Sequence, residues 1–310
     1  MARRLRLQYE GARYHVINRG NYRRDVFETT GATTAFEAVL ADACERYGWR
    51  LHAHVIMRNH YHLALETPQP NLVEGMHWLQ STFATRFNRF RSERGHLFQG
   101  RYQALLVEDP AALVRVINYI HLNPVRAGIV PAQQVAAFRW SSLHRFLKGP
   151  RPPWLAATDL LQELHLEDTR DGWSRYLAGL IELACNLPEQ GRQGFCELAR
   201  GWAIGTEGWR RAVARDHAHL ARTVGIATEE LRDIKKAHWR EALTRALRDV
   251  NKSQAEIDSD PQRSPWKIEI AARLRREVAA PYRWIALTLN LGNPDSIRAY
   301  VSRRQLQFSA

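Results

Sequence analysis

Two histidines stand two positions apart in the stretch RNHYHLALE, residues 58–66. The stretch alternates polar and apolar side chains, which predicts a β-strand, and alternate residues of a strand point to the same face. His60 and His62 are therefore expected to lie side by side. Two adjacent imidazoles can chelate a divalent cation, and they can equally be ordinary strand residues. His52 and His54 have the same spacing and form a competing pair.

A candidate nucleophile and a further ligand stand close together in NYIHLNPVRAG. Tyr119 and Asn123 are four residues apart, so they share one face of a helix, provided that Pro124 leaves the last turn intact. An amide oxygen can be a third metal ligand, and a tyrosyl oxygen beside a metal-bound phosphate is a competent nucleophile. Tyr61 is expected on the strand face opposite to the two histidines. A core aromatic residue is the alternative role for Tyr119.

The elements that would position these residues follow a recognisable order. Apolar periodicity and helix caps predict strands at 13–20, 49–57, 58–66 and 100–108, and helices at 29–48, 70–95 and 109–123. The order β-α-β-β-α-β is that of the ferredoxin-like or RRM-like unit, an α+β fold in which two helices cover one face of an antiparallel sheet. The other face is expected to be open and to carry the site.

The chain changes character after the proline-rich stretch LKGPRPPWL at 147–155. Helical patterns dominate from there, which predicts an all-α C-terminal region. We expect four parts: a ferredoxin-like domain at 1–150, a helical domain at 151–251, a polar linker at 252–264 and a helix-turn-helix-like DNA-binding region at 265–310. In the last part the turn LGNPDS would separate two helices, with Asp295 or Ser296 as the cap.

Charge points to an anionic partner. The chain of 310 residues carries a net charge of +13, and residues 1–150 hold 20 Lys and Arg against 11 Asp and Glu. Most of the basic residues are arginine, whose planar guanidinium suits phosphate and stacks on bases, so a nucleic acid is the expected partner. The chain lacks a run of 18 apolar residues and a signal-peptide core, and its three cysteines are scattered. We therefore expect no membrane partner and a cytoplasmic, nucleoid-associated location.

Four segments together resemble one protein family. MRNHYHLAL, GHLFQGRYQALLVED, YIHLNPVRAGIV and WSSL occur in this order, within roughly residues 8–147. They resemble the single-tyrosine HUH transposases, and specifically the REP-associated tyrosine transposase branch with its IS200-type domain. The resemblance implies that His60 and His62 are metal ligands, that Asn123 is the third ligand and that Tyr119 is the nucleophile.

The resemblance also implies an activity. Members of the family cleave and rejoin single-stranded DNA near hairpins by transesterification, through a 5′-phosphotyrosine intermediate and with Mg or Mn as the divalent metal. Two imidazole ligands favour Mn over Mg. Relatives work as monomers or as homodimers, and the sequence leaves the two open. His121 and Glu108 are the candidates for the base that accepts the tyrosine proton.

Arginines near the predicted site are candidates for a phosphate track. They follow the first strand, lie along the long helix and end the C-terminal region: Arg19, Arg23, Arg24, Arg86, Arg89, Arg298, Arg303 and Arg304. Trp78 and Phe98 are candidates for stacking on bases, with core packing as the alternative.

Two other functions compete with a DNA-processing enzyme. The first is a domesticated transposase fold that regulates by binding DNA through its C-terminal region, without catalysis. The second is an RRM-like RNA-binding module, which needs aromatic residues where the central strand carries His60 and His62. Because ligands and nucleophile are all present, the sequence favours the enzyme.

Overall fold

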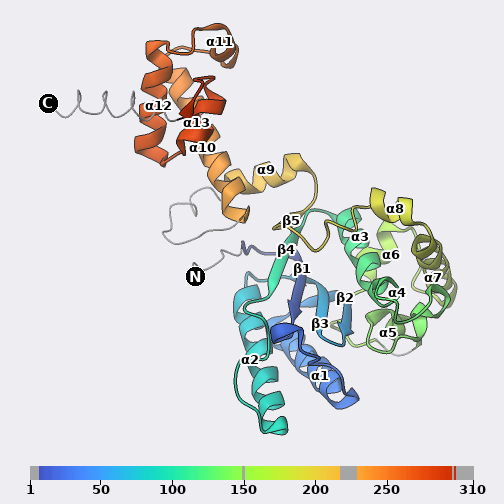
Figure 1. Cartoon of the computed structure of the whole chain (residues 1–310). Helices are drawn as coiled ribbons and strands as arrows, with labels where there is room; N and C mark the ends of the chain where they lie inside the picture. The colour runs from blue at the N-terminus through green and yellow to red at the C-terminus, as the bar shows by residue number, and fades with distance from the viewer. Residues whose placement is uncertain (1–6, 149–150, 217–228, 295–296, 298–310) are drawn as a thin grey trace. The chain divides into compact units, whose positions relative to one another are not determined.

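The computed structural model describes residues 7–148, 151–216, 229–294 and 297 (Figure 1). The chain forms two compact units, and the division between them falls between Trp209 and Arg210. Each unit has its own buried core, so each is described by itself.

The first unit is built on a five-stranded sheet. Its strands are β1 (Ala12–Arg19), β2 (Arg50–Met57), β3 (His60–Thr67), β4 (Gln103–Val107) and β5 (Ala203–Ile204). The order is β2-β3-β1-β4-β5, in which the first four strands pair antiparallel. This is the ferredoxin-like order that the sequence predicted. The short β5 pairs with β4 in parallel, which makes the sheet mixed and was not predicted.

Two helices cover one face of this sheet, as expected. They are α1 (Thr30–Tyr47) and α2 (Leu72–Arg91), and a short 3-10 turn (Asn21–Arg23) precedes α1. Thr29 caps α1 at its start, and left-handed Gly48 ends it. The predicted inward stripe of α2 is buried: Leu72, Met76, Leu79, Phe83 and Phe87. The helix ends at Arg91, where Ser92 takes the left-handed conformation, rather than at Gly95.

The opposite face is not open, which corrects the sequence-based expectation. Helix α3 (Pro110–His121) packs on β2 and β3, and α4 (Asn123–Arg126) continues its direction after Leu122. Asp109 caps α3 by accepting a hydrogen bond from the Ala112 amide at 2.7 Å. A 3-10 helix (Ala132–Ala137) and α5 (Ser142–Lys148) follow.

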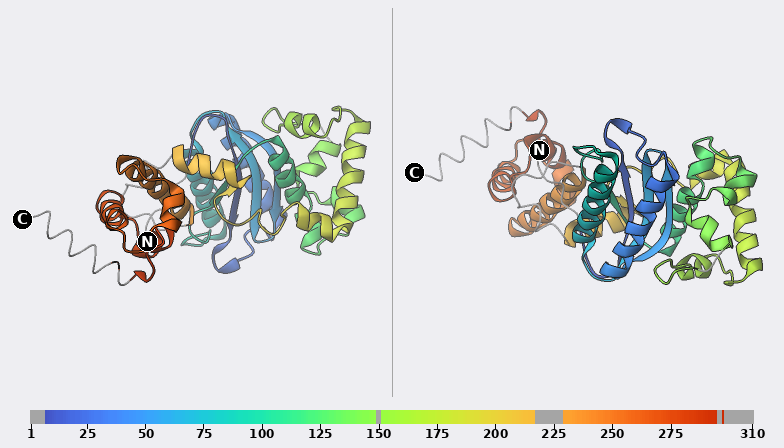
Figure 2. Two further views of the ribbon diagram at one scale, coloured as in Figure 1. Left: turned by 90° about the horizontal axis from the view of Figure 1, so that it is seen from above. Right: turned by 90° about the horizontal axis from the view of Figure 1, so that it is seen from below.

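Helices from beyond residue 150 belong to the same unit. They are α6 (Thr158–Glu163), α7 (Arg170–Cys185) and α8 (Leu187–Arg192), and α6 packs on α3. In Figure 2 the green and yellow helices of this part gather on one side of the sheet. The compact unit therefore continues to Trp209, and does not end near 150 as expected, because long-range contacts rather than composition set its limit.

Glu108 helps to hold β5 in place. Its carboxylate accepts hydrogen bonds from the amide and the hydroxyl of Thr206, directly after β5. This carboxylate was one candidate for the base at Tyr119. Its engagement with Thr206 argues for a structural role instead.

The second unit is helical. Its described helices after α9 (Glu207–Asp216) are α10 (Glu229–Asp249), α11 (Gln254–Ser259), α12 (Pro265–Val278) and α13 (Tyr282–Thr288). A shared core of apolar residues joins α10 to α13, and Ile257 of α11 is buried in it. The buried Lys267 donates to the carbonyls of Ile257 and Asp260 at 2.6 and 2.7 Å. The predicted linker at 252–264 is therefore part of a packed unit.

The C-terminal turn was predicted at LGNPDS. Before that turn, a short connection with left-handed Ala279 joins α12 to α13. The expected caps Asp295 and Ser296 lie outside the described residues, as do Arg298, Arg303 and Arg304, whereas Ile297 after the caps is buried in the core of this unit. Among the helices that the structure describes, none is long and apolar enough to cross a bilayer.

The close packing of α2 against Trp49 leads to a prediction about stability. A Cβ on Gly75 would lie 2.2 Å from the Trp49 ring, whereas a Cβ on Gly179 of α7 meets nothing within 4 Å. We expect Gly75→Ala to lower the free energy of unfolding by about 1–3 kcal/mol, because Trp49 must move. The matched Gly179→Ala should raise it by up to about 1 kcal/mol, because alanine favours the helix. Urea unfolding measures both, and a loss of similar size in both variants would contradict the packing.

The buried His121 leads to a prediction about how the stability of the protein depends on pH. Its Nδ1 lies 2.7 Å from the Tyr176 hydroxyl and its Nε2 lies 2.9 Å from that of Ser142, so it ties α3 to α7 and α5. Burial, followed by the neighbouring His54, lowers the pKa of His121 to about 3. Both ring nitrogens are engaged in the core, which corrects the suggestion that His121 is the base at Tyr119.

Because the pKa of His121 is lower in the folded than in the unfolded chain, its contribution to stability is fully present above pH 6.5. It is lost as the pH falls from there towards 3, at up to about 1.4 kcal/mol per pH unit. Chemical denaturation between pH 7 and pH 4 should therefore show a smaller pH slope for His121→Gln than for the unchanged protein. An identical slope would mean that His121 titrates normally.

Candidate active site

On strand β3, the candidate metal ligands point to one face of the sheet and the core residue Tyr61 points to the other. The Tyr61 ring lies 4.7 Å from that of Phe36 of α1, and its hydroxyl accepts a hydrogen bond from Gln80 of α2 at 2.7 Å. His60 and His62 point to the opposite face, with ring centroids 5.2 Å apart. The two imidazoles therefore lie together on an interior strand, away from α2.

Helices α3 and α4 bring the other two residues to the same place. The Tyr119 ring lies 5.5 Å from the His62 ring. The Asn123 side chain hydrogen-bonds with His60. Leu122 keeps helical dihedral angles and the Ala127 amide donates to the Asn123 carbonyl, so Pro124 does not break the turn. The four sequence-predicted residues thus form one cluster.

His62, Tyr119 and Asn123 are buried and His60 is half-buried, and the pKa values of both imidazoles are lowered. Burial, followed by the nearby Arg19, lowers the pKa of His60 to about 4. Burial also lowers the pKa of His62 well below its ordinary range, and the neighbouring His15, His60 and Arg126 act in the same direction. A neutral imidazole has the lone pair that a metal requires.

The donor set fits a divalent cation. His60 and His62 offer imidazole nitrogens and Asn123 offers an amide oxygen. The Nδ1 atoms already have partners, since that of His60 lies 2.7 Å from Asn59 Oδ1 and that of His62 lies 2.9 Å from His15 Nε2. Each ring therefore keeps its Nε2 atom for a ligand. Two nitrogens and one oxygen suit Mn better than Mg.

Sequence reasoning missed three residues of this cluster. The Arg126 guanidinium lies 4.5 Å from the centroid of the Tyr119 ring, and the Phe195 ring lies 5.6 Å from that of Tyr119. His15 of β1 lies beside His62 and Tyr119, with its ring centroid 5.7 Å from that of Tyr119. The sequence could have indicated Arg126, because this residue stands on the helical turn after Asn123. His15 and Phe195 carry none, because the contacts join distant segments.

The predicted arginines divide between the two sides of the sheet. Arg19 and Arg23 are exposed close to the cluster, where the Arg23 carbonyl accepts a hydrogen bond from Asn59. Arg24 pairs with Glu93 at 2.6 Å. Arg86 and Arg89 are exposed on α2, beyond the opposite sheet face, so they lie away from Tyr119. Trp78 is half-buried against Arg46, and Phe98 packs in the core against Tyr61 and Phe83.

The competing histidine pair is not a second site of this kind. His54 lies 3.3 Å from Glu37, whereas His52 lies 3.9 Å from Glu66, so the two do not converge. A shift in the strand register between Leu51 and Ala53 separates them.

Ligand atoms of His52, Glu66 and Asp159 lie within 4.8 Å of one another, the spacing of a possible metal triad. The carboxylates already bind arginines, since Arg13 contacts Glu66 at 3.2 Å and Asp159 at 2.8 Å, and Arg50 contacts Glu66 at 3.1 Å. A cation would have to displace Arg13. We therefore assign this group to an ion-pair network.

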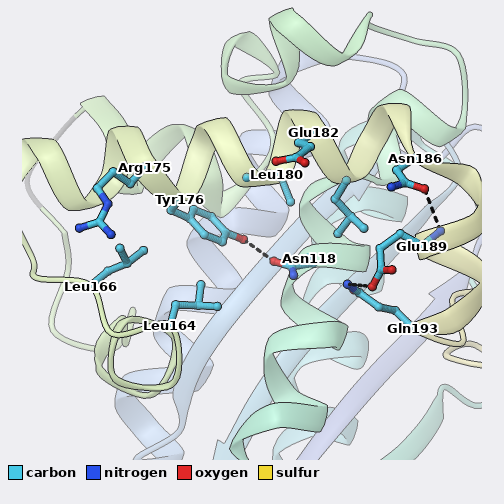
Figure 3. A pocket seen from close by; sticks show the side chains of 12 residues that line it. Asn118, Leu164, Leu166, Arg175, Tyr176, Leu180, Glu182, Asn186, Glu189 and Gln193 are labelled. Carbon is cyan, nitrogen blue, oxygen red and sulfur yellow. Dashed lines mark hydrogen bonds between the residues drawn. The ribbon is translucent and has the colours of Figure 1, made fainter.

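A pocket of about 410 Å³ opens along α7 (Figure 3). Four leucines line it together with seven polar or charged side chains, and among these the Tyr176 hydroxyl donates to Asn118 at 3.0 Å. None of the cluster residues His60, His62 or Tyr119 lines it. The pocket is thus separate from the candidate active site.

Comparisons with known proteins give matches to the part of the chain that contains this cluster. Residues 8–123 match the family model described as "Transposase IS200 like". The chain is 27% identical over 172 residues to a Haemophilus influenzae protein described as "Putative REP-associated tyrosine transposase", across 45% of this chain and 96% of that protein.

A solved structure is similar to 52% of this chain, over 93% of its own chain, at 18% identity and a TM-score of 0.41. It is described as "Structure of the REP associates tyrosine transposase bound to a REP hairpin". Residues 8–123 contain the histidine pair, Tyr119 and Asn123, and this part of the chain is similar to the IS200-like transposases.

Proposed function

We propose that this protein is a metal-dependent endonuclease and strand transferase for single-stranded DNA. It would cleave and rejoin strands near hairpins through a 5′-phosphotyrosine intermediate. The observation that carries the proposal is the position of Tyr119, whose ring lies 5.5 Å from His62 in a cluster with His60 and Asn123. A tyrosine beside three potential ligands is arranged for attack on a bound phosphate.

The chain would hold the metal through His60, His62 and Asn123. When bound, Mg or Mn would polarise the scissile phosphate and help to align it for in-line attack. The full burial of His62 and the partial burial of His60 lower the pKa of both imidazoles and so favour the neutral form that a ligand requires.

Tyr119 would carry out the covalent step. Its hydroxyl oxygen attacks the phosphorus atom, a new P–O bond forms, and the bond to the 3′-oxygen breaks. The departing strand takes up a proton as a 3′-hydroxyl, and the phosphotyrosine ester conserves the bond energy. Attack by a 3′-hydroxyl reverses the step and joins strands without ATP. The Arg126 guanidinium, 4.5 Å from the Tyr119 ring, would stabilise negative charge on the phenolate and the phosphate.

DNA is the proposed partner. A related structure is described as bound to a REP hairpin, and the chain has an excess of basic residues. Arg19 and Arg23 are exposed beside the cluster and would contact phosphates next to the cleaved bond. Action on DNA would place the protein with the nucleoid in the cytoplasm.

The site is complete within one chain. Tyr119 lies beside His62 of the same polypeptide, and the proposed mechanism uses this tyrosine rather than one from a second copy. This arrangement supports a monomer as the active form.

The alternative is a DNA-binding regulator without catalysis. In this alternative the C-terminal unit, which is compact and has its own core, would bind DNA. An RRM-like RNA-binding role is disfavoured, since α3 covers the sheet face that would bind RNA and Tyr61 faces the core.

The decisive test replaces only the tyrosine hydroxyl. Tyr119→Phe keeps the ring and its packing, so the fold and hairpin binding should survive. Covalent, SDS-resistant adducts with labelled hairpin DNA and Mn or Mg should disappear, because the attacking oxygen is gone. The matched Tyr61→Phe should still form the adduct, since Tyr61 points to the other sheet face.

Titration with metal distinguishes a metal ligand, such as His60, from the nucleophile Tyr119. His60→Ala should lose most cleavage and regain part of it in excess Mn, because His62 and Asn123 remain. Tyr119→Phe should regain nothing. An adduct formed by Tyr119→Phe would show that another nucleophile acts, with Tyr61 the next residue to examine. Unimpaired binding without an adduct in the unchanged protein would favour the regulator.

The second unit is expected to add affinity for duplex or hairpin DNA. Because its core extends from α10 to α13, the informative truncation removes residues 210–310 rather than the last helices alone. Hairpin binding should weaken and its dependence on salt concentration should become shallower, since basic residues are lost. Cleavage of saturating single-stranded DNA should continue. Unchanged affinity and salt slope would indicate a protein partner for this unit.

A further inference from the structure

His15 occupies a position next to a proposed metal ligand. In the pairing of β1 with β3, Ile17 stands opposite His62 and His15 stands opposite Ala64. Residues diagonal to each other on neighbouring strands share a face, and the His15 and His62 rings are stacked with centroids 5.1 Å apart. His15 is fully buried.

The hydrogen bonds of His15 define which nitrogen carries the proton. Its Nδ1 lies 2.7 Å from the Leu198 carbonyl oxygen, which can only accept, so Nδ1 is the donor. A buried neutral imidazole has one proton, and therefore its Nε2 is an acceptor. The His62 Nδ1, 2.9 Å away, must then be the donor to it. The lone pair of His62 is left on Nε2.

His60 reaches the same state through a different partner. Asn59 donates its amide nitrogen to the Arg23 carbonyl, which orients its oxygen towards His60. The His60 Nδ1, 2.7 Å from that oxygen, is therefore the donor. Both proposed ligands consequently present Nε2, and both are held by a hydrogen bond at Nδ1.

We propose that His15 is a positioning residue that sets the tautomer and the ring orientation of His62, with the Leu198 carbonyl fixing His15 in turn. This inference rests on the proposed function. It assigns a role to a segment beyond the family-matched residues 8–123, because Leu198 and Phe195 both reach the site from there. Metal ligands whose outer hydrogen-bond partner is removed typically bind metal 10–100-fold more weakly.

Three variants test the proposal. His15→Leu removes the acceptor at His62, whereas His15→Gln retains an amide that can accept from His62 and donate to Leu198. The control is His52→Leu, since His52 is equally buried on the same sheet but its ring nitrogens have no hydrogen-bond partner.

Two readouts do not depend on cleavage. Long-range proton–nitrogen NMR of the metal-free protein reports the tautomer of His62, and calorimetry with Mn²⁺ reports affinity. We expect His62 to carry its proton on Nδ1 in the unchanged protein and to shift towards the other tautomer in His15→Leu. The Kd for Mn²⁺ should rise 10–100-fold in His15→Leu, and less than about 5-fold in His15→Gln and His52→Leu.

Each result has a definite meaning. A His62 proton on Nε2 in the unchanged protein, or an unchanged Kd in a folded His15→Leu, would overturn the proposal. Absence of Mn²⁺ binding by the unchanged protein would overturn both it and the metal-dependent function. If the tautomer and Kd change as expected while the unchanged protein forms no phosphotyrosine, the proposed function fails and the role of His15 stands. Should His15→Leu not fold, the tautomer in the unchanged protein and the Kd of His15→Gln still decide.

Discussion

The two-residue repeat of β3 is the constraint on which the rest of the first unit depends. Neighbouring strand residues must point to opposite faces, so Tyr61 enters the core under α1 and α2 while His60 and His62 face α3. A shift of one residue would exchange these environments and bury two imidazoles among aromatic rings. The packing of Tyr61 against Phe36 therefore fixes the direction of the histidines as well.

Helix α3 brings Tyr119 to the sheet face on which His60 and His62 lie. Its Asp109 cap and Pro110 fix where the helix begins, and Leu122, with right-handed helical dihedral angles, links it to α4, which begins at Asn123. The helix then lies across β2 and β3, which brings Tyr119 to His62. Because α3 also packs on the sheet, it helps to bury His62 and part of His60, and burial lowers the pKa of both imidazoles. The packing of α3 on the sheet thus affects both the position of Tyr119 and the protonation state of the two histidines.

The segment after residue 150 completes the environment of the cluster. Phe195 packs against Tyr119, Arg126 stacks on both rings, and the Leu198 carbonyl engages His15. The pairing of β5 with β4 anchors this segment to the sheet. A unit that ended near residue 150 would expose these groups. The segment that extends the compact unit beyond residue 150 therefore also packs around the cluster.

The sequence by itself determined the features that depend on local geometry. Strand alternation placed His60 and His62 on one face, helical spacing joined Tyr119 to Asn123, and end signals located α1 and α3. These rules act over at most a few residues, so they can be read from neighbouring letters.

Only the tertiary structure decided the remaining features. His15 and Leu198 are 183 residues apart, and no periodicity connects them. The covered sheet face, the strand β5 and the end of the unit at Trp209 depend in the same way on distant packing. The tautomers of the two histidines depend on partners that only folding brings within hydrogen-bond distance, because a donor and an acceptor must lie about 3 Å apart.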